Sequence, residues 1–285
     1  MSERAARRRL VRLLFAPIVA VHLAVYGGYG LLTRQQEQRQ LFLGARDAWK
    51  AGDLATAAAD YHGFIADYAA VTTPFVIVRG MPSAASAWFA LGRVESERGA
   101  VDAALAAFQQ SMALENGLGR REYRDLLFES GRYAALESYA RATLARDPDS
   151  LPATYDLGAA LYASGRAAEA AAVYRRGIAL LPAFLAIEDP HYHGLLPARE
   201  AELLNLESVA LLAAGDAAGA TAVCAGLSAR LRPGVHLDQL CRAYLADAGG
   251  DPAAARAALA GYQPRTPEQA LLSTTLEARL APRGH

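Results

Sequence analysis

The 285-residue sequence predicts an all-α fold, an α-solenoid of about six helix-turn-helix units preceded by a single transmembrane helix. The clearest unit is residues 151–184, where apolar residues recur at helical spacing on both sides of Gly165. Gly158 and Ala170 are small where two such helices would cross, so their backbones can approach closely. Pro182 is expected to end the second helix, because its ring and missing N–H interrupt helical hydrogen bonding.

The same pattern recurs along the chain and predicts the other units. Each unit has a turn glycine, with a small residue seven positions before it and another five positions after it. The turn glycines are Gly52, Gly99, Gly131, Gly165, Gly215 and Gly250. The small residues before them are Ala45, Gly92, Gly158, Ser208 and Ala243, and those after them are Ala57, Ala104, Ala170, Ala220 and Ala255. The two exceptions, Arg124 and Leu136, both fall in the third unit.

Residues 151–184 resemble a tetratricopeptide repeat, a helix-turn-helix unit of 34 residues. The matching positions are Leu157, Gly158, Leu161, Gly165, Ala170, Tyr174 and Pro182. The resemblance covers this unit fully and the other units in part. It implies a stack of such repeats, since one repeat cannot bury both of its faces, and a function in protein recognition.

The N-terminus favours a membrane anchor. Residues 1–12 contain five arginines and are expected to form a basic cytoplasmic tail. Residues 13–33 lack Asp, Glu, Lys and Arg, and this length suits a bilayer of roughly 30 Å. A buried soluble helix and a cleaved signal peptide are the alternatives to this anchor. The arginines predict a single-pass inner-membrane protein with its N-terminus in the cytoplasm and its repeats in the periplasm.

Small residues recur every fourth position within this span. They would let a second helix approach closely, which suggests a membrane-helix partner or a homodimer; abundant alanine is the simpler explanation. These residues are Ala16, Ala20, Ala24 and Gly28.

The repeat array is expected over residues 34–264, interrupted by insertions at 72–84 and 185–200, with a C-terminal capping helix and tail at 265–285. The second insertion holds His191 and His193 near two carboxylates, Glu188 and Asp189. A metal ion would need a third strong ligand such as histidine or cysteine, and none is near, so no metal site is predicted.

The only two cysteines are Cys224 and Cys241. The repeat register places them on neighbouring helices of the fifth and sixth units. They would form a disulfide in an oxidising compartment, or pack as two buried thiols.

Composition and motifs argue against two classes of function. There are 29 basic and 29 acidic residues, and a nucleic-acid-binding protein would normally have a basic excess. No nucleophile elbow, zinc-protease motif, phosphate-binding loop or dinucleotide fingerprint is present. We therefore expect neither an enzyme nor a cofactor.

The resemblance to tetratricopeptide arrays implies a concave surface lined by the first helix of each unit. The side chains that it places there, and that form the predicted partner site, are Arg39, Phe42, Arg46, Trp49, Phe89, Arg93, Arg121, Phe128, Tyr155 and Tyr162. Aromatic residues and arginine are enriched in binding hot spots. One interpretation is a groove for an acidic or C-terminal peptide of a partner protein. The other is that some aromatics pack against a neighbouring unit.

The predicted function is a membrane-anchored scaffold that binds partner proteins and helps assemble or hold an envelope complex. The alternatives are an exported soluble peptide-binding protein and a receptor whose repeats face the cytosol.

Overall fold

The computed structural model describes residues 28–71, 80–115, 117–187, 196–231 and 236–281. Within these ranges every regular element is a helix and there is no strand, which confirms the all-α prediction. The chain divides into two units, Met1–Leu126 (unit 1) and Leu127–His285 (unit 2). Each unit is described by itself.

Unit 1 contains two complete helical hairpins. A helix over residues 28–50 contacts α2 (Leu54–Val71) through Phe42 and Gln38, and α3 (Ala84–Glu97) pairs with α4 (Val101–Leu114). α5 (Arg120–Glu129) begins in this unit. The largest fully buried side chains of unit 1 are Tyr61, Phe64, Leu91 and Phe108. The Phe108 ring lies beside Gly92, where an added Cβ would be 2.6 Å from it, so the close crossing of α3 and α4 depends on that glycine.

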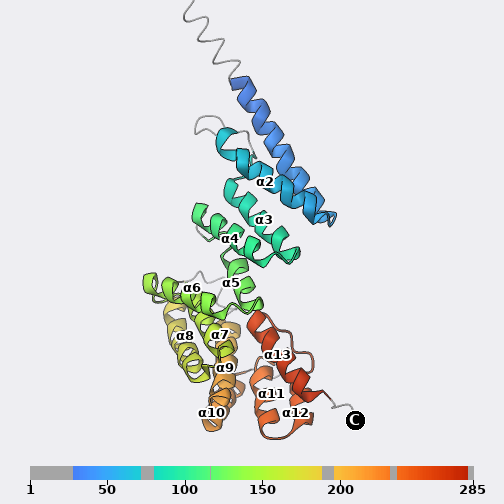
Figure 1. Cartoon of the computed structure of the whole chain (residues 1–285). Helices are drawn as coiled ribbons and strands as arrows, with labels where there is room; N and C mark the ends of the chain where they lie inside the picture. Colours follow the sequence, from blue (N-terminus) through green and yellow to red (C-terminus); the bar gives the residue numbers. More distant parts are fainter. Residues whose placement is uncertain (1–27, 72–79, 116, 188–195, 232–235, 282–285) are drawn as a thin grey trace, which may run out of the picture. The chain divides into compact units, whose positions relative to one another are not determined.

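Unit 2 continues the same construction with three further hairpins (Figure 1). Its helices are α6 (Tyr133–Arg146), α7 (Leu151–Ala163), α8 (Ala167–Ile187), α9 (Leu196–Ala213), α10 (Ala217–Arg230), α11 (Gln239–Ala248), α12 (Pro252–Leu259) and α13 (Pro267–Leu280). Helices from α6 to α10 each pack against the next along the chain, and α11 packs against α12. One core cluster runs through this unit and includes the fully buried Tyr174, Leu203, Leu240 and Leu276.

The glycine corners are confirmed. All six predicted turn glycines have positive φ, between 71° and 87°, a conformation that side chains other than glycine rarely adopt. At the fourth corner the N–H of Gly165 donates to the carbonyl of Tyr162 and that of Arg166 to Leu161, both at 2.9 Å. The alanines five positions after the corners are fully buried: Ala57, Ala104, Ala170, Ala220 and Ala255.

The third unit of the sequence pattern coincides with the division of the chain. The boundary between Leu126 and Leu127 falls within α5. The two residues that break the small-residue pattern, Arg124 and Leu136, lie on either side of it. Leu136 is buried all the same, so its position in α6 faces the core as the repeat register requires.

The expected end of the fourth unit is wrong. α8 continues beyond Pro182 to Ile187, and α9 already begins at Leu196. Proline removes one hydrogen-bond donor, but a helix can pass through it at a cost when its neighbours support it. The helices therefore take up both ends of the insertion expected at 185–200.

Several N-terminal and insertion predictions fall outside the described residues. They include residues 1–27 with Ala16, Ala20 and Ala24, residues 72–79, and the histidine-containing residues 188–195. Gly28 is described, and the space beside it is open. None of the described helices combines the length and apolar character needed to cross a bilayer. Residues 28–33, the end of the predicted span, are helical and continue without interruption to residue 50.

Candidate partner-binding surfaces

Two of the predicted partner-site residues of unit 1 meet on the surface. The guanidinium of Arg93 in α3 lies 4.7 Å from the centre of the Trp49 ring, within the range of a cation–π interaction. Trp49 packs its ring on the core and donates its indole N–H to the Glu97 carboxylate at 2.7 Å. Arg46, one helical turn before Trp49, is exposed and pairs with Asp47 at 3.3 Å. We call Arg39, Arg46, Trp49 and Arg93 the Arg/Trp surface.

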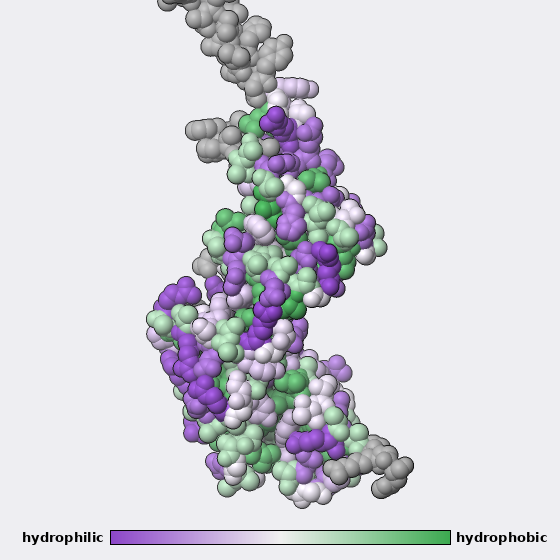
Figure 2. Space-filling model, in the orientation of Figure 1, coloured by the Kyte–Doolittle hydropathy of each residue, from purple (hydrophilic) through white to green (hydrophobic). Residues whose placement is uncertain are grey.

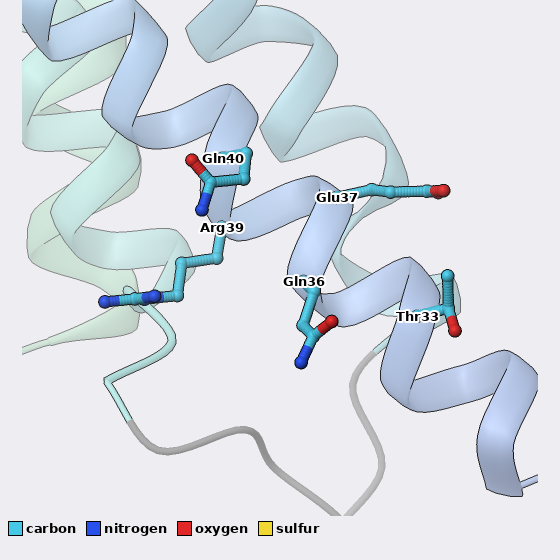
Figure 3. Close-up of a pocket in the computed structure, with 5 residues that line it drawn as sticks. All are labelled: Thr33, Gln36, Glu37, Arg39 and Gln40. Carbon is cyan, nitrogen blue, oxygen red and sulfur yellow. The ribbon is translucent and has the colours of Figure 1, made fainter.

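Arg39 lies at the N-terminal end of this surface, beside an open polar pocket. Figure 3 shows the pocket on the helix of residues 28–50, with Arg39 pointing away from the helix axis. The lining residues are Thr33, Gln36, Glu37, Arg39 and Gln40. The pocket therefore has both a cation, Arg39, and a carboxylate, Glu37, at its edge.

The three predicted phenylalanines are engaged in packing. The Phe42 ring lies 5.3 Å from Tyr61 in an edge-to-face arrangement, and Phe89 lies 6.1 Å from Phe108. Phe128, in unit 2, is buried and lies 5.4 Å from Tyr133. Core packing therefore explains why these three positions hold phenylalanine.

Arg121 on α5 is exposed and pairs with Asp125 at 3.4 Å. Burial raises the pKa of the Asp125 carboxyl, and the neighbouring Arg124 and Arg121 oppose that rise. The ion pair is solvent-exposed on the arginine side, so it contributes little stability and leaves the guanidinium accessible to solvent.

The other two predicted residues of unit 2, Tyr155 and Tyr162, lie on α7 and are partly buried. Tyr155 donates its hydroxyl to the carbonyl of Arg199 at 3.0 Å and lies 3.4 Å from the Glu202 carboxylate. Tyr162 packs against the core cluster that also contains Leu272, Leu276 and Leu280 of α13. The surface of α8, α9, α11 and α12 that contacts α13 is here called the inner groove.

α13 binds the inner groove through one stripe of side chains spaced four residues apart. The stripe is Glu268, Leu272, Leu276 and Leu280, all buried. Polar contacts flank it at several points: Tyr174 donates its hydroxyl to Glu268, Gln269 donates to Glu202 at 3.0 Å, and Tyr244 donates to the Leu272 carbonyl at 3.0 Å. Arg279 pairs with Asp247 at 3.0 Å. α13 packs on α11 and α12, the last hairpin of the array.

The groove holds carboxyl groups away from water. Burial raises the pKa of Glu268 to about 8, and the nearby Glu202 and Asp156 carboxylates act in the same direction. Burial also raises the pKa of Glu202 and that of the Tyr174 phenol. Sequence reasoning missed this cluster, because a glutamate in the first turn of a helix is normally exposed. The four-residue spacing of 268, 272, 276 and 280 was the available signal.

A disulfide joins α10 to α11. Cys224 and Cys241 are bonded, with their Cα atoms 5.9 Å apart. The N–H of Cys241 donates to the side-chain oxygen of Asn205 at 3.0 Å, which ties the same point to α9. The bond therefore fixes the last two hairpins to each other.

The exposed side of unit 2 carries a network of ion pairs. Glu137 of α6 accepts from Arg141 at 2.7 Å and from Arg166 at 2.8 Å, and Arg166 also pairs with Glu169 at 2.6 Å. Hydrogen bonds from Arg141 and Arg166 hold the pKa of Glu137 below its usual value. Figure 2 shows this area over α6 and α8 as strongly hydrophilic. Among the described residues no three His, Cys, Asp or Glu side chains are grouped as metal ligands.

Comparisons with known proteins agree with this construction. The tetratricopeptide repeat family model matches residues 42–114 and 125–183. A comparison with curated proteins finds no match.

Three solved structures are similar in part. The pilF protein of Pseudomonas aeruginosa has 14% identity and a TM-score of 0.45, covering 85% of this chain and 99% of that one. A tetratricopeptide repeat protein from Parabacteroides merdae has 15% identity and a TM-score of 0.41, covering 85% and 98%. The APC/C hetero-tetramer Cut9–Hcn1 has 13% identity and a TM-score of 0.46, covering 86% and 46%. All three TM-scores are below 0.5, so these remain partial similarities.

The corners at Gly52, Gly99, Gly131 and Gly165, the small residues at the helix crossings and the family match therefore support tetratricopeptide repeats as the units from which residues 42–114 and 125–183 are built.

Proposed function

We propose that this chain is a scaffold that binds partner proteins through the Arg/Trp surface of unit 1 and holds them in a complex at the cell envelope. The observation that carries the proposal is the exposed Arg93 guanidinium stacked on Trp49. Tryptophan and arginine are the side chains that most often dominate binding energy at protein interfaces. Here Trp49 is already positioned by the core and by Glu97, so little side-chain entropy would be lost on binding.

The proposed ligand is an acidic or C-terminal peptide segment of the partner. Arg46 and Arg93 each present an exposed guanidinium, which pairs with carboxylates in a bidentate geometry. Asp47 competes for Arg46, so the ligand must exchange one ion pair for another there. Arg93 can bind a carboxylate without giving up its contact with Trp49. A guanidinium that lies over an aromatic ring still has N–H groups in its own plane that can donate to a ligand.

A peptide binding assay tests this proposal. Full-length protein in mild detergent is titrated with a fluorescent library of acidic peptides, prepared once with free C-terminal carboxylates and once amidated. The expected result is binding to the acidic peptides that the double variant R46E/R93E loses. A stronger signal for the free carboxylate would identify a chain terminus as the ligand.

The matched control is Arg34→Glu, which changes the same charge on an exposed position of the same helix. It should leave peptide binding as in the wild type. Equal binding by the wild type and R46E/R93E would refute the Arg/Trp surface as the ligand site.

The envelope location rests on three supports. Residues 1–12 contain five arginines, residues 13–33 contain no charged side chain, and unit 2 contains a disulfide. The first two features are typical of an uncleaved anchor with its N-terminus in the cytoplasm, and the third is typical of an oxidising compartment such as the periplasm.

Alkaline-phosphatase fusions after residue 71 and after residue 285 test this topology, since the phosphatase is active only when exported. We expect both to be active, and N-terminal sequencing to find residues 1–33 retained. A mature chain beginning after the apolar segment would favour the exported soluble alternative. Inactive fusions would favour the cytosol-facing receptor.

A further inference from the structure

The first helix of unit 1 projects beyond α2, the helix on which it packs. Two contacts fix the register of the pair. The Gln38 amide donates to the Asp67 carboxylate at 3.2 Å, and a Cβ added at Gly63 would lie 3.4 Å from the Leu41 side chain. The two helices are therefore antiparallel, and α2 ends four residues after Asp67, opposite the position four residues before Gln38. Residues 28–33 of the first helix thus extend past the end of α2.

These projecting residues carry exposed apolar side chains. Tyr29 is 73% exposed and Leu32 is 40% exposed, whereas Gln35, one turn further on, is fully buried. Packing against the described part of the protein therefore begins at Gln35. Residues 13–33 contain no charged side chain, so the exposed tyrosine lies near the end of an uncharged segment. Tyrosine in that position is typical of the boundary between a membrane and water.

The length of the projection matches the headgroup layer of a bilayer. Six helical residues rise by roughly 9 Å. The polar layer on each side of the hydrocarbon core is about 5–8 Å thick. If Tyr29 lies at the edge of the hydrocarbon core, the end of the first hairpin therefore lies at the level of the lipid headgroups.

Two arginines lie at this end of the hairpin. Arg34 is exposed and Arg39 is half-buried, and within the described ranges neither forms an ion pair with a carboxylate. The nearby carboxylates are Glu37 and Asp67. Figure 3 shows Arg39 and Glu37 pointing to different sides of the helix. The Asp67 carboxylate accepts a hydrogen bond from Gln38. Both guanidinium groups are therefore available for an anion from outside the protein.

The pocket beside Arg39 adds uncharged hydrogen-bonding groups. Thr33, Gln36 and Gln40 line it with a hydroxyl and two amides (Figure 3). Guanidinium groups bind phosphate oxygens in a bidentate geometry. A long arginine side chain can keep its stem on the helix while its charged end reaches the headgroups. This set of groups suits a phosphate that carries further hydroxyl groups, as in the headgroup of phosphatidylglycerol.

We propose that Arg34 and Arg39 bind the phosphate groups of anionic phospholipids, so that the end of the first hairpin rests on the membrane surface. The inference rests on the membrane anchor proposed above. It does not depend on peptide binding, which is tested through Arg46 and Arg93.

The test measures which lipid gathers beside residue 29. The full-length Tyr29→Trp chain is placed in nanodiscs of phosphatidylcholine that contain a small, equal fraction of brominated phosphatidylglycerol or brominated phosphatidylcholine. Bromine quenches a tryptophan that it contacts, and the same measurement on the wild type subtracts the signals of Trp49 and Trp88. Phosphatidylglycerol should be enriched beside residue 29 by at least about fivefold, the effect of one arginine near a membrane surface.

The variant R34Q/R39Q, made in the same Tyr29→Trp chain, should lose this enrichment. The matched control is K50Q/R120Q, which removes the same charge from exposed positions elsewhere in unit 1 and should keep it. High salt should weaken the enrichment in the unaltered pair, because it screens exposed charges. Equal enrichment in R34Q/R39Q and the control would overturn the proposal.

The same experiment separates a failure of this inference from a failure of the anchor. If both brominated lipids quench residue 29 equally in the chain that retains both arginines, the anchor stands and the phosphate site is refuted. If neither lipid quenches residue 29, this residue is not at the membrane, and the anchor and the phosphate site are refuted together.

Discussion

The inner walls of the two units differ, although their hairpins are built alike. In unit 1 Arg46 and Arg93 are exposed and Trp49 is partly so, whereas in unit 2 Tyr155 and Tyr162 pack against the core cluster and the buried Tyr174 donates to Glu268 of α13. The crossings of the hairpins match: Gly92 admits the ring of Phe108 in unit 1, and Gly158 admits the ring of Tyr174 in unit 2. The comparison teaches that the repeat pattern fixes how the helices pair, while α13, which follows the array, adds its own buried side chains to the core of unit 2.

The two units can be followed separately because both tryptophans, Trp49 and Trp88, lie in unit 1. Tryptophan fluorescence therefore reports the unfolding of unit 1, and far-ultraviolet circular dichroism reports the helices of both units. A change that is confined to unit 2 should move the second signal and leave the first one in place.

The largest expected difference comes from the disulfide, which only unit 2 contains. Replacing Cys224 and Cys241 by serine opens a loop of 17 residues. We expect the free energy of unfolding of unit 2 to fall by about 3 kcal/mol, while unit 1 is unchanged. Chemical denaturation followed by both signals measures this. Intact mass with and without reductant checks the bond itself, and absence of a two-dalton difference would contradict it.

The next largest effect tests the matched crossings. Gly158→Ala should destabilise unit 2 by about 1–3 kcal/mol, because the new methyl group overlaps the Tyr174 ring, whose hydroxyl is held by Glu268. Gly92→Ala should cost unit 1 less, since the ring of Phe108 has no such hydrogen bond and can shift. Denaturation midpoints of the two variants give the ranking. If Gly92→Ala destabilises its unit more than Gly158→Ala does, the hydrogen bond from Tyr174 to Glu268 does not restrict the movement of the Tyr174 ring.

A change of pH, as distinct from a substitution, should also alter the stability of unit 2. The pKa of Glu268 is about 8 in the folded chain and near 4.5 in the unfolded chain, so between these values the unfolded chain binds fewer protons. The stability of unit 2 should therefore fall as pH rises from about 5 to 8, by at most about 1.4 kcal/mol per pH unit from this group.

The variant Glu268→Gln removes the titrating group and keeps a hydrogen-bonding side chain of the same size. The dichroism midpoint of this variant should depend less on pH than that of the wild type. Parallel pH profiles for the two proteins would show that Glu268 is ionised in the folded chain.

The smallest expected effect lies on the open wall. Arg93→Ala removes the cation over Trp49 and should lower the stability of unit 1 by about 0.5–1 kcal/mol. The tryptophan signal measures this loss, with Arg34→Ala as the exposed control on the same helix as Trp49. A loss of several kcal/mol in the free energy of unfolding would mean that Arg93 is part of the core of unit 1. The Arg/Trp surface would then not be a ligand site.

Much of the fold could be predicted from residue spacing. Positive-φ glycines and small crossing residues leave a local signature, and all six corners carry it, from Gly52 to Gly250. The break in the pattern at Arg124 and Leu136 likewise coincides with the division into two units. The prediction that the helix ends at Pro182 was wrong. It considered only the local effect of proline, whereas α8 continues to Ile187.

The candidate site was less predictable. The spacing of Leu272, Leu276 and Leu280 shows that α13 has one buried face, but not which helices cover it. That depends on the path of residues 260–266 and on distant partners such as Tyr174, which lies 94 residues from Glu268. The phenylalanines predicted on the concave surface were equally hard to assign, because aromatic residues are common both in binding hot spots and in protein cores.

The helix of residues 28–50 has a mechanical consequence. At 1.5 Å per residue it is a rod of roughly 34 Å, and it forms one arm of the first hairpin. No hinge separates its exposed beginning at Tyr29 from its packed end at Trp49. A displacement of the beginning of this helix would therefore also move Arg39, Arg46 and Trp49, the three residues of the Arg/Trp surface that lie on it.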